Sequence, residues 1–313
     1  MIEQLNAWGR ARRPFFFCID YEKKAPLYYP LDQLPQTIRY TMHGEQHARQ
    51  HHLPTLHAHP MSYECYAKQY HHVQEYIRSG HTYLLNLTCA TPLTLSWDLH
   101  DIYHHAQAPF KLCVDEKFVL FSPERFFKIT DNTINTYRMK GTIDATLPDA
   151  QTLLLDNPKE LAEHTMVVDL LRNDLSRVAT NVRVASFRYI QTIHAGDKEL
   201  LQTSSHIQGQ LPNTWHETIG TILDGLLPAG SITGTPKKET CRIIQETEQS
   251  ERGYYTGVFG VYDGQSLDSA VMIRFIEKTP HGLVYRSGGG ITCESDPLLE
   301  YQEMVAKVYV PVS

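Results

Sequence analysis

Two short segments each carry a pair of glutamates spaced three residues apart. Glu160 and Glu163 lie in the first segment, and Glu300 and Glu303 lie in the second. Residues i and i+3 project from one face of a helix, so each pair can present two carboxylates together. Either pair alone is typical of a solvated helix face that is balanced by Lys or Arg. If the two helices face each other, four carboxylates converge, and a divalent cation such as Mg²⁺ relieves their repulsion.

Both glutamate pairs follow the start signals of a helix. Asn157-Pro158 precedes the first pair, and Asp296-Pro297 precedes the second. Asn and Asp are good N-caps, and Pro suits the first helical position. The sequence therefore predicts two helices that begin at these steps and present their glutamates in the first turns.

Two glycine-containing segments could receive an anion. Ser287–Ile291 has three consecutive glycines, including Gly288 and Gly289, after a predicted strand, and backbone N–H groups can approach an anion closely there. Gly230–Lys237, which includes Thr233, precedes a predicted helix, and helix N-termini attract anions. A flexible turn and a helix capped by Thr235 are the ordinary structural explanations of these segments.

Two cationic side chains could serve a site. Arg274 interrupts the apolar run Ala270–Ile276, so it lies either on a solvent face or in a pocket that holds a carboxylate. The alternation of side chains leaves both possibilities open. Lys140 ends a strand-like run before Gly141, where it is either a surface lysine or a functional amine.

The composition excludes several classes of protein. The 313 residues have a formal net charge of -6, which disfavours a nucleic-acid partner. No apolar run is long enough to span a bilayer, and residues 1–6 lack the pattern of a signal peptide, so we expect no membrane partner and a cytoplasmic location. Six scattered cysteines without a CxxC pair predict small buried thiols. Many of the 17 histidines lie between His43 and His105 without a ligand pattern, which favours a polar surface over a metal site.

The apolar pattern predicts helices interspersed with strands. Ser62 can cap a helix that ends at Gly80 and carries an apolar stripe. Residues 44–60 have no period and predict a loop. Strand-like runs occupy residues 15–19, 83–87, 117–121, 125–129, 257–262, 270–276 and 283–286, and the last three predict an antiparallel meander. Mixed order with hairpins favours an α+β fold, and the absence of a linker favours one domain over residues 1–313.

These segments, taken in order from about Gly80 to the C-terminus, resemble the chorismate-utilising enzymes. That family includes component I of anthranilate synthase and of aminodeoxychorismate synthase, the isochorismate synthases and the salicylate synthases. The resemblance implies a two-sheet β-sandwich with helices packed outside, and one catalytic domain whose N-terminal region, about 1–60, is short. It rests on these collinear motifs: Ser122–Phe126, Lys140–Thr142, Ala162–His164, Val168–Asp174, Gly230–Lys237, Ser287–Ile291 and Glu300–Glu303.

The resemblance also implies a role for individual residues. Glu163 and Glu303 are the implied Mg²⁺ ligands, with Glu160 and Glu300 bound directly or through water. Glu124 matches the general acid that protonates the departing C4 hydroxyl of chorismate. The implied substrate-binding residues are Arg274, Tyr255, Thr233, Gly288, Gly289, Lys307 and Gln202. Gln202 stands where the family has a histidine, and an amide can hydrogen-bond a substrate but cannot shuttle a proton.

Within the family, the chain resembles the aminodeoxychorismate branch. Lys140 stands where that branch has a lysine, whose neutral amine attacks C2 of chorismate before ammonia adds at C4. Leu84 stands where isochorismate and salicylate synthases have a basic lysine. A separate glutamine amidotransferase subunit is implied as the source of ammonia. The alternatives are an anthranilate synthase component I or another aminating enzyme, and a catalytically weak binding subunit of an amidotransferase complex.

Overall fold

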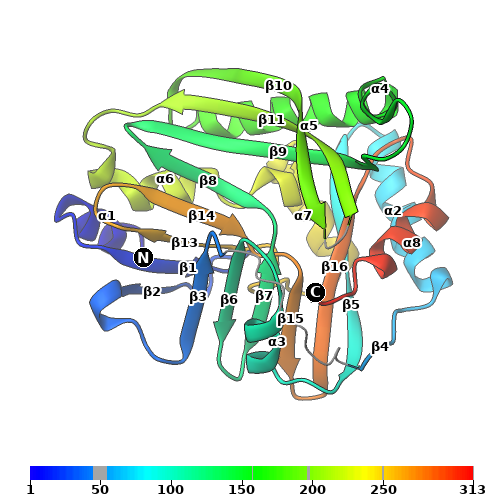
Figure 1. Ribbon diagram of the computed structural model, residues 1–313, viewed down its shortest axis with the longest axis horizontal. Helices are drawn as coiled ribbons and strands as arrows, with labels where there is room; N and C mark the ends of the chain where they lie inside the picture. The colour runs from blue at the N-terminus through cyan, green and yellow to red at the C-terminus, as the bar shows by residue number, and fades with distance from the viewer. Residues whose placement is uncertain (45–54, 157, 196–197, 249, 313) are drawn as a thin grey trace. The chain divides into compact units, whose positions relative to one another are not determined.

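The computed structural model describes residues 1–44, 55–156, 158–195, 198–248 and 250–312, which form two compact units (Figure 1). Unit 1 comprises Met1–Phe15, Arg125–Ser231 and Val261–Ser269, and unit 2 comprises Phe16–Glu124, Ile232–Gly260 and Ala270–Ser313. Helices combine with two antiparallel sheets, which confirms the predicted α+β class. The single catalytic domain over residues 1–313 stays a prediction.

Unit 1 is built on long antiparallel strands in the order β10-β11-β9-β8. Arg125 at the start of β8 donates to the Asp268 carboxylate at 2.9 Å, which ties β8 to the β14 strand. The elements of this unit are α1 (Ile2–Arg10), β8 (Arg125–Thr130), β9 (Thr133–Asp144), α4 (Ala150–Leu155), α5 (Pro158–Ser176), β10 (Thr180–Ala195), β11 (Lys198–Gln210), the 3-10 turn Trp215–Thr218 and α6 (Ile219–Leu226). β13 (Val258–Tyr262) and β14 (Leu267–Val271) have residues in both units.

Unit 2 contains the whole of the second sheet, in the order β12-β5-β16-β15-β7-β6-β3, with β4 paired to β5 (Figure 1). Its strands are β1 (Phe15–Ile19, of which Phe15 belongs to unit 1), β2 (Leu27–Pro30), β3 (Ile38–Met42), β4 (Leu56–Ala58), β5 (Leu84–Leu95), β6 (Phe110–Val114), β7 (Phe118–Ser122), β12 (Gly234–Thr235), β15 (Phe275–Thr279) and β16 (Gly282–Ile291). Its helices are α2 (Tyr63–Arg78), α3 (Leu99–His105), α7 (Lys237–Glu248) and α8 (Pro297–Ala306), with a 3-10 turn at Leu31–Gln33. The 3-10 turn Gly230–Ile232 has residues in both units.

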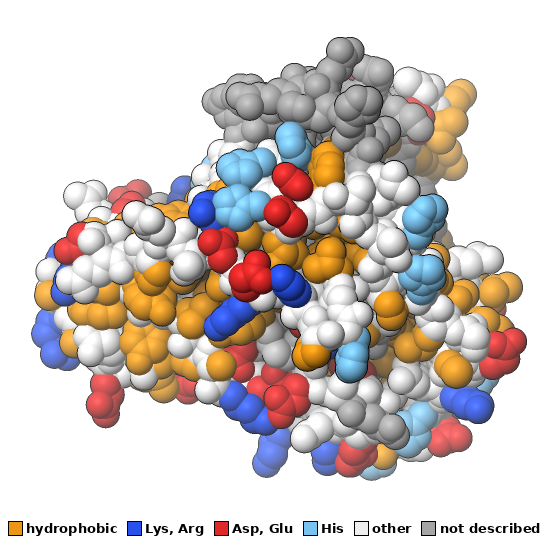
Figure 2. All heavy atoms as spheres, turned by 90° about the horizontal axis from the view of Figure 1, so that it is seen from below, with side chains coloured by type: hydrophobic (Ala, Val, Ile, Leu, Met, Phe, Trp, Pro, Cys, Tyr) orange, Lys and Arg blue, Asp and Glu red, His pale blue; other side chains and the backbone are white. Residues whose placement is uncertain are grey.

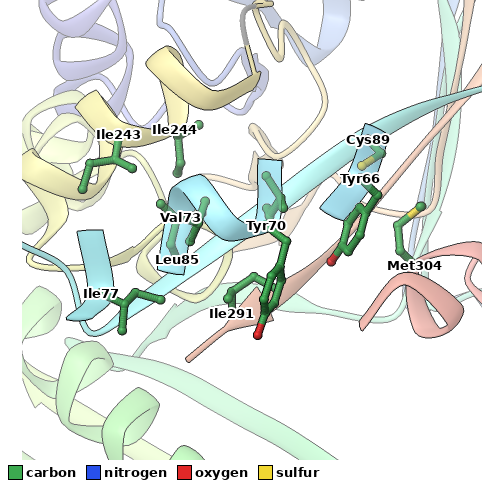
Figure 3. Packing of buried hydrophobic residues seen from close by; sticks show 11 residues of the cluster. Tyr66, Tyr70, Val73, Ile77, Leu85, Cys89, Ile243, Ile244, Ile291 and Met304 are labelled. Carbon is green, nitrogen blue, oxygen red and sulfur yellow. The ribbon is translucent and has the colours of Figure 1, made fainter. Parts of the chain in front are cut away.

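The predicted helix after Ser62 is α2, and its apolar stripe is buried. The Ser62 hydroxyl accepts from the Cys65 N–H at 3.4 Å, and Gly80 beyond the helix end has φ of 75°. The stripe packs against β5, α7, β16 and α8 in one hydrophobic cluster (Figure 3). Burial of these side chains supplies the stability that a short helix lacks on its own. The cluster members are Tyr66, Tyr70, Val73, Ile77, Leu85, Leu87, Cys89, Ile243, Ile244, Ile291 and Met304.

The loop predicted over residues 44–60 is wrong in its last part. Residues 45–54 lie outside the described residues, but Leu56–Ala58 form β4, which pairs with β5. So short a strand has no period of its own and forms because a neighbouring strand completes its hydrogen bonds.

The strand predicted over residues 270–276 is also wrong. β14 ends at Val271, β15 begins at Phe275, and the two belong to different sheets. Arg274, between them, has φ of 54°, a left-handed conformation that ends strand geometry. The predicted meander is therefore two hairpins.

The glycine segment and the segment before α7 both differ from the ordinary structural explanations that their sequences suggested. The three glycines are not a turn but part of β16, where Gly288 lies opposite Thr88 and Gly290 opposite Asn86 of β5. Thr235 is not a helix cap but lies in β12, and α7 begins two residues later. The predicted cap Asn157 lies outside the described residues, although α5 begins at Pro158 as expected.

All six cysteines are free, and three of them are buried as predicted: Cys18, Cys89 and Cys113. Cys65 and Cys293 are exposed, so the prediction is wrong for these two. Histidine side chains lie at several separate places on the face shown in Figure 2, in keeping with a polar surface. In the part of the chain that is described, no helix is both long enough and apolar enough to cross a membrane.

Candidate active site

α8 carries two of the predicted metal ligands, Glu300 and Glu303, and the cation Lys307 follows at its C-terminal end. The Asp296 carboxylate accepts from the backbone N–H groups of Leu298 and Leu299, each at 2.9 Å, and so caps the helix as predicted. Lys307, at the helix end, places Nζ 2.7 Å from Oε1 of Glu303. The spacings of three and four residues between Glu300, Glu303 and Lys307 therefore bring these three side chains to one side of α8.

The glycine segment of β16 lies directly beside these charges. Lys307 Nζ donates to the carbonyl oxygen of Gly288 at 2.8 Å. A Cβ atom on Gly289 would lie 3.3 Å from Oε2 of Glu300 and 3.8 Å from Lys307 Nζ. Glycine at this position leaves room for both groups. Unit 2 thus brings together five predicted site residues, namely Gly288, Gly289, Glu300, Glu303 and Lys307, which we call the α8–β16 cluster.

The other predicted residues of unit 2 occupy half-buried or buried positions. Arg274 is half-buried, with its guanidinium carbon 5.5 Å from the centre of the Tyr309 ring. Tyr255 is buried, and burial raises the pKa of its hydroxyl, which stays neutral at physiological pH. The buried Thr233 accepts the Asn86 N–H at 2.9 Å through its carbonyl oxygen.

Glu124 lies between β7 and β8 and is half-buried. Its N–H donates to the Ser122 hydroxyl at 3.1 Å, and its carbonyl accepts from the Val271 N–H at 3.0 Å. The backbone of this residue is therefore held on both sides, which restricts where its carboxyl group can reach.

In unit 1, Glu160 lies close to the strand that carries Lys140. A Cβ atom on Gly141 would lie 3.5 Å from Oε2 of Glu160 and 3.6 Å from the Thr203 hydroxyl. Gly141 has φ of 70°, a conformation that favours glycine. The backbone of Lys140 lies in β9 opposite Thr203, while its side chain lies outside what the structure describes.

α5 is anchored next to Glu163 by a buried histidine. His164 Nε2 lies 2.7 Å from the hydroxyl of Ser205 on β11, and that hydroxyl also accepts the Arg188 N–H at 2.8 Å. Glu163 itself is half-buried. Gln202, also on β11, is half-buried and lies opposite Thr142.

The donor set of each glutamate pair suits a hard cation. Mg²⁺ prefers oxygen ligands, and both pairs offer carboxylates only. Among the residues that the structure describes, no group of three or more His, Cys, Asp or Glu side chains is placed to hold a metal ion. α5 belongs to unit 1 and α8 to unit 2, so the convergence of all four carboxylates stays a prediction.

The sequence reasoning missed a buried ion pair that holds β5, the strand paired with the glycine strand β16. Arg252 donates to both carboxylate oxygens of Glu248, at 2.9 and 2.6 Å, and the two side chains are 1% and 3% exposed. Arg252 also donates to the carbonyls of Asn86 and Ile232, while Glu248 accepts from the N–H and hydroxyl of Thr88. The spacing of four residues was visible in the sequence, but it is typical of exposed helix pairs as well.

The family of the chain follows from a comparison with known proteins. The model of the family described as chorismate binding enzyme matches residues 20–313. The chain belongs to the chorismate-binding enzyme family. The resemblance stated from the sequence is thereby confirmed.

Individual relatives of this chorismate-binding enzyme agree. It is 49% identical over 317 residues to an uncharacterized PabA-like protein of Pasteurella multocida, covering 99% of this chain and 98% of the relative. It is 33% identical over 263 residues to aminodeoxychorismate synthase component 1 of Klebsiella aerogenes, covering 79% of this chain and 57% of that enzyme. The menaquinone-specific isochorismate synthase of Escherichia coli has the same fold, with a TM-score of 0.69, 16% identity, and 98% and 79% of the two chains covered.

Proposed function

We propose that this chorismate-binding enzyme converts chorismate to 4-amino-4-deoxychorismate, with Mg²⁺ bound and with ammonia from a separate glutamine amidotransferase subunit. The observation that carries the proposal is the 33% identity to aminodeoxychorismate synthase component 1 over 79% of this chain. Lys140, which the sequence resemblance matches to the lysine of that branch, has its backbone in β9, directly before Gly141 and close to Glu160.

The α8–β16 cluster can receive a dianionic substrate. Lys307 is a half-buried cation next to the backbone of Gly288, and it would attract one substrate carboxylate. Glu300 and Glu303 would hold Mg²⁺ together with Glu160 and Glu163. The metal would neutralise the carboxylates and accept an oxygen of the substrate. Arg274 would orient the other carboxylate of chorismate.

Two side chains would carry the bond changes. The neutral amine of Lys140 forms a bond to C2 as the two conjugated ring double bonds shift and the C4–O bond breaks. Glu124 donates a proton to the C4 hydroxyl, so it departs as water. Ammonia then forms the bond to C4, both ring double bonds shift back, and the C2–N bond to Lys140 breaks. After proton loss, the amino group is on C4 and the lysine is free again.

The test is product identification. The enzyme is incubated with chorismate, ammonium and Mg²⁺, and the product is identified by mass and by its conversion to p-aminobenzoate with an added lyase. We expect 4-amino-4-deoxychorismate from the wild type and none from Lys140→Ala. Lys278→Ala is the matched control, since Lys278 is an exposed lysine paired with Glu116 on a hairpin of unit 2.

Other results would point to the two alternatives. Fluorescent anthranilate, formed without the lyase, would replace the proposal with an anthranilate synthase. Normal amination by Lys140→Ala would remove the nucleophilic role of that lysine while leaving the chorismate chemistry intact. Chorismate binding without turnover, and without an effect of Mg²⁺, would favour a binding subunit.

A further inference from the structure

A short turn between β16 and α8 holds the Glu300 carboxylate through the hydroxyl of Ser295. The Ser295 hydroxyl lies 2.8 Å from Oε1 of Glu300 and accepts the backbone N–H of Thr292 at 3.1 Å. Because a carboxylate only accepts hydrogen bonds, the Ser295 hydroxyl donates its proton to Oε1 of Glu300. The other oxygen of Glu300, Oε2, is the one that lies beside Gly289.

Two side chains of α2, Tyr70 and Gln74, hold the turn Thr292–Ser295 in place. Tyr70 donates its hydroxyl to the carbonyl oxygen of Ser295, and Gln74 donates its amide to the carbonyl oxygen of Thr292 at 2.6 Å. Gln74 also donates to the Tyr70 hydroxyl at 2.9 Å, so the two side chains act as one support. Tyr70 and Gln74 are each 3% exposed, and Tyr70 belongs to the cluster with Ile291 at the end of β16 (Figure 3).

We propose that Ser295 is a positioning residue for the metal, and that Tyr70 and Gln74 keep it in place. The inference rests on the proposed function, in which Glu300 is a ligand of Mg²⁺. With Oε1 held by Ser295, the carboxylate cannot rotate freely, and Oε2 is left on the side of Gly289 and Lys307. Hydrogen-bonded partners that orient a ligand in this way contribute strongly to metal affinity.

The test measures the affinity for Mn²⁺, used as a paramagnetic substitute for Mg²⁺, from the signal of the free ion. We expect Ser295→Ala to raise the Kd on the order of 10- to 100-fold. Ser295→Thr keeps a hydroxyl and should bind close to the wild type. Thermal unfolding of each variant shows whether the fold is retained.

The matched control is Ser266→Ala. The Ser266 hydroxyl also donates to a carboxylate within a tight turn, at 2.7 Å to Asp263, but it lies on the β13–β14 hairpin. This variant should bind Mn²⁺ like the wild type. An equal loss of affinity in Ser266→Ala would overturn the inference, as would wild-type affinity in Ser295→Ala or a failure of Ser295→Thr to restore binding.

A double-mutant cycle tests the support from α2. Tyr70→Phe keeps the ring in the cluster and removes only the hydroxyl, so the Kd should rise about 2- to 10-fold, as expected for one neutral hydrogen bond. The variant that combines Tyr70→Phe with Ser295→Ala should bind no more weakly than Ser295→Ala alone, because both changes act through one carboxylate. Fully additive losses would refute the coupling.

The outcome for this inference is separable from the outcome for the proposed function. If the variants behave as expected but the product is not 4-amino-4-deoxychorismate, the reaction is wrong and the role of Ser295 stands. If the product is 4-amino-4-deoxychorismate and Ser295→Ala binds Mn²⁺ normally, the proposed reaction stands and the role of Ser295 is wrong. A wild-type protein that does not bind Mn²⁺ overturns the inference.

Discussion

Glu248→Gln should destabilise the protein far more than a change of one charge usually does. The substitution keeps the size of the side chain, and the amide oxygen can still accept from Thr88. The amide nitrogen, however, would face the donor Nε of Arg252, which now lies 2.9 Å from a carboxylate oxygen. The guanidinium would then be a buried cation without its counter-charge.

The magnitude follows from the burial of the pair. Removing one partner of a buried, hydrogen-bonded ion pair costs about 3–5 kcal/mol, because the remaining charge is left in a medium that solvates it poorly. For a folding unit with the size of unit 2, in which the pair lies, that loss lowers Tm by roughly 6–20 °C. The matched control is Glu246→Gln, which breaks an exposed ion pair with Arg242 whose side chains are 43% and 44% exposed. The control should unfold with nearly the free energy of the wild type, because exposed ion pairs contribute little to stability.

Urea unfolding, followed by circular dichroism, measures the free energy of unfolding of both variants. A Glu248→Gln protein within 1 kcal/mol of the wild type, on the order expected for a surface pair, would refute the reasoning. Replacing both members of the pair with Met should not restore stability. The carbonyls of Asn86 and Ile232 and the N–H of Thr88 would lose their partners in that variant.

Two further predictions concern the glycine strand and a buried histidine. Gly288→Ala should destabilise the fold by about 1–3 kcal/mol, since the new Cβ would lie 2.5 Å from the Leu87 carbonyl oxygen. Gly289→Ala should leave Tm unchanged, but it should weaken Mn²⁺ binding because the new Cβ would displace the Glu300 carboxylate. Thermal unfolding and Mn²⁺ titration of both proteins distinguish these outcomes. Burial and the Arg12 guanidinium lower the pKa of His216 to about 4. In the unfolded chain, the His216 imidazole has a pKa of about 6.5, so the unfolded state binds a proton before the folded state does as the pH falls. The stabilisation that is present above pH 6.5 is therefore lost as the pH falls towards 4. Between pH 7 and 5, the wild type should lose about 2 kcal/mol more unfolding free energy than His216→Gln, and parallel pH profiles would contradict this.

Elements with local signals were predictable. Ser62 and Asp296 cap α2 and α8 because a side-chain oxygen reaches N–H groups only two or three residues away, and such signals are visible in the sequence. The spacing of Glu300, Glu303 and Lys307 was equally local, and it placed these side chains on one side of α8.

Features set by distant neighbours were not predictable in this way. Three glycines in a row suit a turn, but pairing with β5 keeps them extended in β16. The left-handed residue Arg274 carries no local signal, since glycine and asparagine are the usual occupants of that conformation. The ion pair of Glu248 and Arg252 has the spacing of a surface pair, and its burial depends on elements far away in the sequence.

The two exposed thiols give this protein built-in attachment points for spectroscopic labels. Cys293 lies within the Thr292–Ser295 turn, and Cys65 lies in the first turn of α2, so both belong to unit 2. Because Cys18, Cys89 and Cys113 are buried, thiol-reactive dyes react less with these three thiols than with the exposed ones. A fluorophore on Cys293 would sit two residues from Ser295, where it can report changes at Glu300 without an engineered cysteine.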